Sequence, residues 1–377
     1  MNPKKKKILF LYLKTGGGHE APARSIAKYL NKYKNDEVES LLIDGFEKSK
    51  RIARFIVVDG YRILQNNAKW IYELIYAFHK IRIVSELSAF LVSFNTRKYL
   101  YNTIINEKPD KIVIFHFFLI SPVYKILKET KLNIPVITVV TDPYSAHPLW
   151  FLNKDQNFIV FSRQLKDKLI RDGIKETNIN VFPFILDEKY SKRATPEEIA
   201  VYKKKNEIKS SNVLLVLGGA DGIPHGLAIL NNLVKLTIDF EILVVCGKDK
   251  KLYDDAVKLK EKLNDTGLKV FGFVDFVYEL ISVSDVIISK CGASTFMEIL
   301  LSRKVPIINS YIWEQEKGNV VFLVENELGI YEKNIFRLPE IVKQLFLNKN
   351  LIEKYKNNIE KMNLVNGADQ VAEFIAK

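Results

Sequence analysis

The feature that most constrains this chain is a repeated alternation of short, wholly apolar runs with longer helix-like stretches. Apolar runs without polar alternation predict strands that are buried on both faces, and helices between such strands predict parallel sheets. The predicted strands, in chain order, are Ile8–Leu13, Val38–Ile43, Lys111–Phe117, Val136–Val140, Phe158–Phe161, Val213–Leu217, Phe240–Val245, Lys269–Phe271, Val286–Ile288 and Pro306–Ile308. We therefore expect an α/β fold.

The two halves of the chain open in the same way. Gly16-Gly17-Gly18 follows the first predicted strand, and Gly218-Gly219 follows the strand Val213–Leu217. A polar, Lys-rich stretch over residues 187–212 separates the halves. This repetition predicts two Rossmann-like domains that face a cleft, one over residues 1–190 and one over residues 191–361.

The charge of the chain is unevenly distributed. The 377 residues carry a formal net charge of +13, and nearly all of it comes from residues 1–190, where 31 Lys and Arg face 19 Asp and Glu. Such asymmetry indicates an anionic partner for the first half, which could be nucleic acid, an anionic membrane surface or an acidic substrate. A merely solubilising surface is the plainer interpretation. The hydrophobic content of 47% excludes wholesale disorder.

The number of cysteines and the lengths of the apolar runs indicate the cellular compartment of the protein. Cys246 and Cys291 are too few for a disulfide framework, which fits a reducing cytoplasm. No apolar run approaches the roughly 18–20 residues of a membrane-spanning helix, and Ile8–Leu13 is too short for the core of a signal peptide. These features predict a cytoplasmic protein.

One segment, residues 46–105, breaks the alternation and reads as long helices. It combines ten Lys and Arg with four acidic residues and eleven aromatic residues. Basic residues interleaved with aromatic ones are typical of helices that lie in a lipid headgroup layer, although the aromatics could equally form a helical core. Arg51, Arg54, Trp70 and Tyr72 are the candidate membrane or acceptor contacts.

Polar residues follow two predicted strands of the first half. Thr15-Gly16-Gly17-Gly18-His19 follows the first strand, and the stretch from Thr141 to Trp150 follows Val136–Val140. Open α/β sheets bind ligands at the carboxyl ends of their strands, so both stretches are candidate sites. We predict His19 as a general base, with Asp142 orienting it or binding a substrate hydroxyl. Gly17, Gly18, His147 and Trp150 are predicted acceptor contacts, whereas a structured loop with Asp142 as a turn cap is the simpler interpretation.

Three stretches of the second half have the chemistry of a nucleotide-sugar site. Each follows a predicted strand, and backbone amides and hydroxyls at a helix N-terminus suit a diphosphate, while carboxylates and amides suit sugar hydroxyls. The candidate donor-binding residues are Gly218, Gly219 and Gly222 in the first stretch, Gly292, Ser294, Thr295 and Glu298 in the second, and Gln315, Glu316 and Asn319 in the third.

Taken in order, these motifs resemble a known family. GGGH, TD…HPLWF, GG-x-x-G, KCGAST-x-x-E and QE-x-GN together are similar to the glycosyltransferases related to monogalactosyldiacylglycerol synthase and processive diacylglycerol glucosyltransferase, and more distantly to the N-acetylglucosaminyltransferase of lipid II synthesis. The resemblance implies a GT-B fold, inverting transfer from a UDP-sugar, and a lipid acceptor, most simply diacylglycerol, at the cytoplasmic membrane face. It also implies that a C-terminal helix over residues 362–377 packs back on the first domain.

The family motifs also imply roles for single residues. His19 matches the base position, Phe273 and Val274 fall where the family packs the uracil ring, and Gln315 and Glu316 match the sugar-reading pair. The chain departs from the family motifs at three places, which are GGADGIP, Glu314 and Phe182-Pro183-Phe184. These departures affect the expected identity of the donor sugar more than the expected class of reaction.

The sequence predicts a transferase that needs no cofactor and no metal, because the chain contains no Asp-x-Asp motif. The alternatives are a UDP-N-acetylglucosamine transferase acting on an undecaprenyl-linked precursor, a UDP-sugar epimerase, and a UDP-sugar sensor without turnover. The expected partners are a UDP-sugar, a membrane lipid and an anionic membrane surface, and no nucleic acid.

Overall fold

The computed structural model describes residues 4–14, 17–47, 69–220, 222–263 and 267–377. The described chain divides into two compact units. The first contains residues 1–188, 313–315 and 366–377, and the second contains residues 189–312 and 316–365. The sequence placed the boundary at residue 190. No helix of the described chain is long and apolar enough to cross a membrane.

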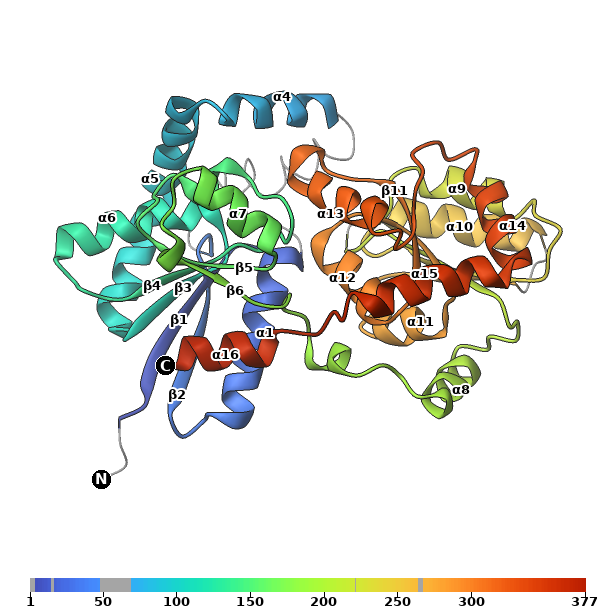
Figure 1. The fold of residues 1–377 in the computed structure, drawn as a ribbon, viewed down its shortest axis with the longest axis horizontal. Helices are drawn as coiled ribbons and strands as arrows, with labels where there is room; N and C mark the ends of the chain where they lie inside the picture. The colour runs from blue at the N-terminus through green and yellow to red at the C-terminus, as the bar shows by residue number, and fades with distance from the viewer. Residues whose placement is uncertain (1–3, 15–16, 48–68, 221, 264–266) are drawn as a thin grey trace. The chain divides into compact units, whose positions relative to one another are not determined.

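A parallel sheet of order β2-β1-β3-β4-β5-β6 forms the centre of the first unit (Figure 1). Its strands are β1 (Lys6–Tyr12), β2 (Val38–Asp44), β3 (Lys111–Ile114), β4 (Val136–Val139), β5 (Asn157–Val160) and β6 (Ile179–Val181). Its helices are α1 (Gly17–Tyr33), α4 (Lys69–His79), α5 (Arg82–Glu107), α6 (Ile120–Thr130), α7 (Arg163–Arg171) and α16 (Ala368–Ala376), with short 3-10 turns at η2 (Phe117–Leu119), η3 (Pro148–Phe151), η4 (Glu176–Asn178) and η5 (Glu188–Ser191). The central strands β1, β3, β4 and β5 are mostly buried, as their apolar runs require, whereas the edge strands β2 and β6 are only partly buried.

The second unit repeats this plan around a parallel sheet of order β12-β11-β10-β7-β8-β9. Its strands are β7 (Val213–Leu217), β8 (Glu241–Val245), β9 (Leu268–Phe271), β10 (Val286–Lys290), β11 (Val305–Ser310) and β12 (Ile330–Tyr331). Its helices are α8 (Pro196–Lys205), α9 (Gly226–Leu233), α10 (Lys250–Leu263), α11 (Val277–Val283), α12 (Ala293–Leu301), α13 (Trp313–Glu325), α14 (Leu338–Leu347) and α15 (Lys349–Lys361). The α/β fold with parallel sheets is confirmed.

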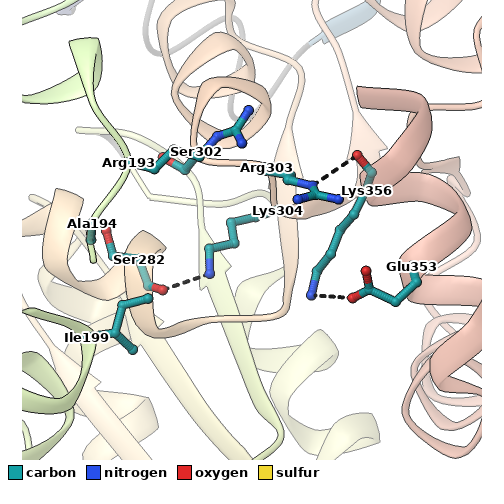
Figure 2. A pocket seen from close by; sticks show the side chains of 9 residues that line it. All are labelled: Arg193, Ala194, Ile199, Ser282, Ser302, Arg303, Lys304, Glu353 and Lys356. Atoms are coloured by element: carbon teal, nitrogen blue, oxygen red, sulfur yellow. Dashed lines mark hydrogen bonds and ion pairs between the residues drawn. The ribbon is translucent and has the colours of Figure 1, made fainter. Parts of the chain in front are cut away.

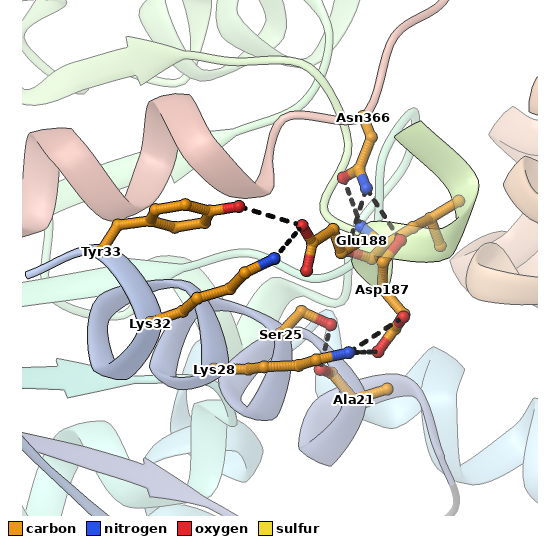
Figure 3. A network of polar contacts seen from close by, with 9 residues as sticks. Ala21, Ser25, Lys28, Lys32, Tyr33, Asp187, Glu188 and Asn366 are labelled. Carbon is orange, nitrogen blue, oxygen red and sulfur yellow. Dashed lines mark hydrogen bonds and ion pairs between the residues drawn. The ribbon is translucent and has the colours of Figure 1, made fainter. Parts of the chain in front are cut away.

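The end of the chain packs on the first unit. Helix α16 lies beside α1 (Figure 1), and the Asn366 side chain, which is buried, accepts a hydrogen bond from Leu186 N (2.9 Å) and donates one to Asp187 O (3.0 Å). Figure 3 shows this contact beside the ion pairs Lys28–Asp187 and Lys32–Glu188, which tie the same segment to α1. Residues from both ends of the chain therefore complete one unit.

The observed fold differs from the predicted local structure in two respects. The predicted strand Lys111–Phe117 ends at Ile114, because the His116 side chain accepts a hydrogen bond from Phe118 N and begins the turn η2. Strands β6 and β12 were not predicted, since they are only three and two residues long and lack a continuous buried run. Within residues 46–105, α4 and α5 are helical as expected, whereas residues 48–68 lie outside the described part.

Candidate active site

His19 lies at the carboxyl ends of the central strands of the first sheet. Its Nδ1 is 2.8 Å from Phe115 O, just after β3, and 2.9 Å from Thr141 Oγ1, just after β4. A carbonyl oxygen can only accept, so Nδ1 carries the proton and donates it to Phe115 O. Nε2 is then the nitrogen with the free electron pair. This tautomer is the one that a base acting through Nε2 requires.

Burial lowers the pKa of His19 to about 4, which keeps the ring neutral at neutral pH and able to accept a proton. Neither Phe115 nor Thr141 was predicted to contact it, because both contacts arise only when adjacent strands are paired.

The prediction that a glycine loop carries His19 is wrong in detail. Gly17, Gly18 and His19 form the first turn of α1, and Thr15 and Gly16 lie outside the described residues.

Gly17 and Gly18 have room around them. A methyl group built on either glycine would have no atom within 4 Å, and neither has a positive φ. Their glycine identity is therefore not required by the folded backbone. Among the described residues nothing fills the space beside these two positions, and their acceptor role stays a prediction.

Asp142 does not orient His19. Its Oδ2 accepts a hydrogen bond from Trp150 Nε1 at 3.0 Å, and the carboxyl group is buried. This burial raises the pKa of Asp142 to about 6, although the Trp150 hydrogen bond acts in the opposite direction. Trp150 itself is fully buried, so the prediction that it contacts lipid or acceptor directly is wrong. Trp150 instead packs beneath the site, with its ring centroid 6.2 Å from that of His19.

Two further histidines support this site. His147 is buried, and its Nδ1 accepts a hydrogen bond from Leu149 N at 3.2 Å, which caps η3. His116, which was not predicted, caps η2 in the same way and lies 4.4 Å from His19 between ring centroids. Phe117 contacts the His116 ring and stacks on His147, with a 5.0 Å centroid separation in the second pair. The buried position of His147 is at odds with a direct membrane contact.

These buried groups predict a distinctive pH dependence of stability. Burial lowers the pKa of His19, His116 and His147, so the unfolded chain binds more protons than the folded one between about pH 6.5 and 4, and stability falls as pH falls through that window. The raised pKa of Asp142 has the opposite effect on stability as the pH falls. Its folded carboxyl takes up a proton near pH 6, whereas the unfolded one does so near pH 4, so acidification favours folding.

The Asp142→Asn variant isolates the second contribution. We expect the stability of this variant relative to the wild type to rise by up to roughly 3 kcal/mol between pH 4 and pH 7, because two pKa units correspond to about that free energy. The difference that remains at pH 4 reflects the amide NH2 of the variant, which must face one of two donors, Trp150 Nε1 or Gln315 Nε2. Urea unfolding of both proteins at several pH values measures the relative stability. A stability difference that does not change with pH would contradict the assignment.

In the second unit, the loop after β7 approaches the start of α12. Gly219 has a φ of +74°, and a methyl group built on it would lie 3.7 Å from Lys290 Cε and 3.9 Å from Thr295 Oγ1. β7 and β10 are neighbours in the sheet, which brings the ends of both strands to one edge. Lys290 is a cation beside these residues that was not predicted. Gly222, also at positive φ, closes the loop against Cys246 O.

The N-terminus of α12 has no side-chain cap. Gly292 is the N-cap residue, and Ser294 Oγ is buried without a hydrogen-bond partner among the described residues. Asn319 Nδ2 donates to Cys291 O at 3.0 Å, while its Oδ1 is likewise buried and unpartnered in the described chain. The uncapped helix amides and the Ser294 hydroxyl can donate to an anionic group, whereas Asn319 Oδ1 can accept a hydrogen bond from a ligand hydroxyl.

The remaining predicted donor residues occupy different positions around this loop. Glu316 Oε2 accepts from Ile312 N at 2.6 Å, and a methyl group on Gly292 would lie 3.7 Å from Glu316 Oε1, so both border the α12 start. Glu298 lies further along α12. Gln315, in the first turn of α13, belongs instead to the first unit, where its Nε2 donates a hydrogen bond to Asp142 Oδ1 at 3.1 Å. Phe273 is 64% exposed beside Lys248, next to the half-buried Val274, with open aromatic surface.

The structure does not describe the side chains of four predicted membrane or acceptor contacts. Arg51 and Arg54 lie outside the described residues, and the side chains of Trp70 and Tyr72, in α4, are not among those described. Exposed apolar side chains run along α4, α5 and the turn between them. They include Leu74, Ile75, Phe78, Ile81, Ile83, Leu87, Phe90, Leu91 and Phe94.

Comparison with known proteins identifies both halves. Residues 19–183 match the family model for monogalactosyldiacylglycerol (MGDG) synthase, and residues 213–371 match the C-terminal domain of glycosyltransferase family 28. This chain contains an MGDG-synthase domain followed by a C-terminal domain of glycosyltransferase family 28. The resemblance expected from the motifs is thereby confirmed.

Curated relatives support this glycosyltransferase assignment along most of the chain. It is 26% identical over 358 residues to the probable chloroplastic monogalactosyldiacylglycerol synthase of Nicotiana tabacum, covering 90% of this chain but 64% of that protein. It is 25% identical over 376 residues to the processive diacylglycerol beta-glucosyltransferase of Bacillus subtilis, covering 99% of this chain and 95% of the relative. The chain thus spans about two thirds of the plant relative's length.

Solved structures share the architecture of this chain. A glycosyltransferase of Rickettsia africae superposes with a TM-score of 0.60 at 18% identity, covering 99% of both chains. HepE of Anabaena, solved with UDP-glucose, superposes with a TM-score of 0.59 at 14% identity, covering 98% of both chains. At these identities the match establishes the fold, which is GT-B, as predicted.

Proposed function

We propose that this chain transfers a hexose from UDP-glucose or UDP-galactose to a hydroxyl of diacylglycerol, with inversion at the anomeric carbon. The observation that carries the proposal is the His19 ring, which is neutral and presents Nε2 at the carboxyl edge of the first sheet. Family membership supports the reaction class, and the relatives named above are enzymes of diacylglycerol glycosylation.

In the proposed reaction, the acceptor oxygen attacks the anomeric carbon while Nε2 of His19 takes the hydroxyl proton. The new bond joins the acceptor oxygen to that carbon, and the bond from the carbon to the diphosphate oxygen breaks. UDP leaves with the electron pair of the broken bond. Amides at the start of α12, the Ser294 hydroxyl and Lys290 would stabilise the charge on the leaving diphosphate.

The experiment that tests this proposal measures UDP release with and without acceptor. The protein is incubated with UDP-glucose, UDP-galactose or UDP-N-acetylglucosamine, in the presence and absence of diacylglycerol vesicles. The proposal expects UDP only when a UDP-hexose and diacylglycerol are both present. A new sugar nucleotide formed without lipid would indicate an epimerase, and donor binding without any turnover would indicate a sensor. Either result would overturn the proposal.

We expect the activity to be unchanged by EDTA. Because helix amides and a lysine side chain already supply positive potential beside the proposed diphosphate position, no divalent cation is required there. UDP release is compared with and without a millimolar excess of chelator over any contaminating metal. Loss of activity that added Mg²⁺ restores would show that the diphosphate needs a metal.

We further propose that α4 and α5 dock on an anionic membrane, on its cytoplasmic face. Ile83 and Phe94 are 76% and 73% exposed, and such apolar area is costly in water unless a partner covers it. Arg82, Arg97 and Lys98 lie on α5. Arg82 pairs with Glu86 and Arg97 pairs with Glu129, so the exposed Lys98 is the cation that would attract an anionic leaflet most directly.

The Ile83→Ser/Phe94→Ser double variant should lose at least about tenfold in vesicle binding, because two large apolar side chains no longer enter the lipid layer. Co-sedimentation with vesicles containing phosphatidylglycerol measures it, and wild-type binding should weaken as salt rises. Phe336→Ser is the matched control, since Phe336 is 76% exposed in the other unit. Equal binding by the double variant and this control would exclude α4 and α5 as the docking surface.

A further inference from the structure

The second unit contains a pocket at the edge of its sheet opposite the donor loops. Its cavity volume is about 240 Å³. Ser302, Arg303 and Lys304 line it just before β11 begins, and Ser282 lines it just before β10. Amino ends of parallel strands share one edge, whereas the loops after β7 and β10 lie at the carboxyl edge. The pocket is therefore separate from the proposed UDP-sugar site.

Cations dominate the wall of this pocket. Arg193, Arg303, Lys304 and Lys356 line it, together with the single acid Glu353 (Figure 2). Two of these cations share one carboxylate outside the lining, because Arg193 and Arg303 both contact Glu360, at 2.7 Å and 3.4 Å. Lys356 pairs with Glu353 at 3.1 Å. Four cations thus face two acids, which leaves an excess of about two positive charges.

Lys304 is the cation without an acidic partner. Its Nζ donates to Ser282 O at 2.7 Å, and no carboxylate in the described chain lies within 4.0 Å of it. Burial lowers the pKa of Lys304 to about 8, so the ammonium group remains mostly charged at neutral pH at a cost in free energy. A buried ammonium with one neutral acceptor has donors to spare for an anion.

A neutral donor lies beside Lys304. Ser302 Oγ is buried and has no hydrogen-bond partner among the described residues. Arg303 N donates to Leu300 O and Lys304 N donates to Ile299 O, which is the Schellman arrangement at the end of α12. This turn presents Ser302, Arg303 and Lys304 in succession to the same cavity (Figure 2).

We propose that this pocket binds a phosphate group, held by Lys304 and the Ser302 hydroxyl and flanked by Arg303 and Lys356. A phosphate dianion would match the excess positive charge and would accept from both the ammonium group and the hydroxyl. The cavity has the volume of about eight water molecules in the liquid, which leaves room for a short polyol attached to the phosphate. The phosphate could belong to a soluble ester or to a lipid headgroup.

The test measures binding of glycerol 3-phosphate by calorimetry in a phosphate-free buffer at constant ionic strength, with saturating UDP present so that the donor loops are occupied. Vesicles with and without phosphatidylglycerol form a second arm. Saturable binding of the soluble ester supports a site for free phosphate esters. Binding confined to phosphatidylglycerol vesicles and sensitive to the variants below supports a site for the lipid headgroup. Both arms measure binding, so they remain valid even if the protein shows no transferase activity.

Lys304→Met should weaken binding at least about tenfold, because it removes the unpaired charge and keeps most of the side-chain volume. Ser302→Ala removes only the unpartnered hydroxyl and should weaken binding severalfold without disturbing the fold. Lys354→Met, on α15 but paired with Glu327 outside the cavity, is the matched control and should bind as the wild type does. Binding that is absent in both arms, or unchanged in Lys304→Met and Ser302→Ala, would overturn the proposal.

Discussion

Replacing His19 by alanine is expected to lower the turnover of glycosyl transfer by about 10²–10⁴-fold, the usual contribution of a positioned general base. The loss should fall on kcat. His19 Nδ1 is occupied by Phe115 O and Thr141 Oγ1, so Nε2 is the group that the variant removes from the reaction. UDP release in the presence of diacylglycerol vesicles and the preferred UDP-hexose measures it.

The control for this variant is donor binding. The donor loops lie in the second unit, so UDP affinity measured by calorimetry should not change in His19→Ala. Thr141→Val should reduce turnover less than His19→Ala, because it loosens the ring while keeping the base. If His19→Ala retained wild-type turnover, His19 would not be the base and Asp142 would be the next candidate.

Replacing Gly218 by alanine is expected to abolish UDP binding and to destabilise the second unit by more than about 3 kcal/mol. A methyl group on Gly218 would lie 2.0 Å from Gly222 O and 2.2 Å from Ile223 N, and these are backbone atoms that cannot rotate away. The loop must therefore open, which displaces Gly219 from Lys290 and Thr295. Urea unfolding and calorimetry with UDP measure the two effects.

Gly292→Ala is the matched control in the neighbouring donor loop. Its added methyl group would meet Glu316 Oε1 at 3.7 Å, an ordinary contact, and Gly292 has no positive φ. We expect near-wild-type stability from this variant. Equal stability of Gly218→Ala and Gly292→Ala would contradict the closed geometry of the loop after β7.

The layered fold could be predicted because its signal is local. Each central strand is an uninterrupted apolar run, and Val213–Leu217 appears in the structure with the predicted bounds. The edge strands β6 and β12 carry no such signal, since edge positions are only partly buried and tolerate polar residues. The predicted strand Lys111–Phe117 runs too far because nothing in its composition reveals that His116 caps a turn.

The site could be predicted only in part, for a similar reason. Glycine and histidine motifs are visible in the sequence, and in the structure they follow β1, β4, β7 and β10. The contacts that fix the His19 tautomer come from Phe115 and Thr141, which are brought to it only by strand pairing.

Burial changed the meaning of several predicted residues. Trp150 and His147 were predicted to contact the acceptor, but both side chains are buried. Trp150 donates a hydrogen bond to Asp142, and His147 caps η3. The pocket that we propose for phosphate could not be predicted, because Arg193, Lys304 and Lys356 come from three distant segments with no motif in common. Such a set exists only in the folded chain.

The most direct test of the central proposal is mass spectrometry of the lipid product. The protein is incubated with diacylglycerol vesicles and a single UDP-hexose, and the lipids are extracted and analysed. We expect diacylglycerol to acquire the mass of one hexose residue, and we expect His19→Ala to produce almost none of this product. Consumption of the UDP-hexose with no glycosylated lipid would contradict the proposed function.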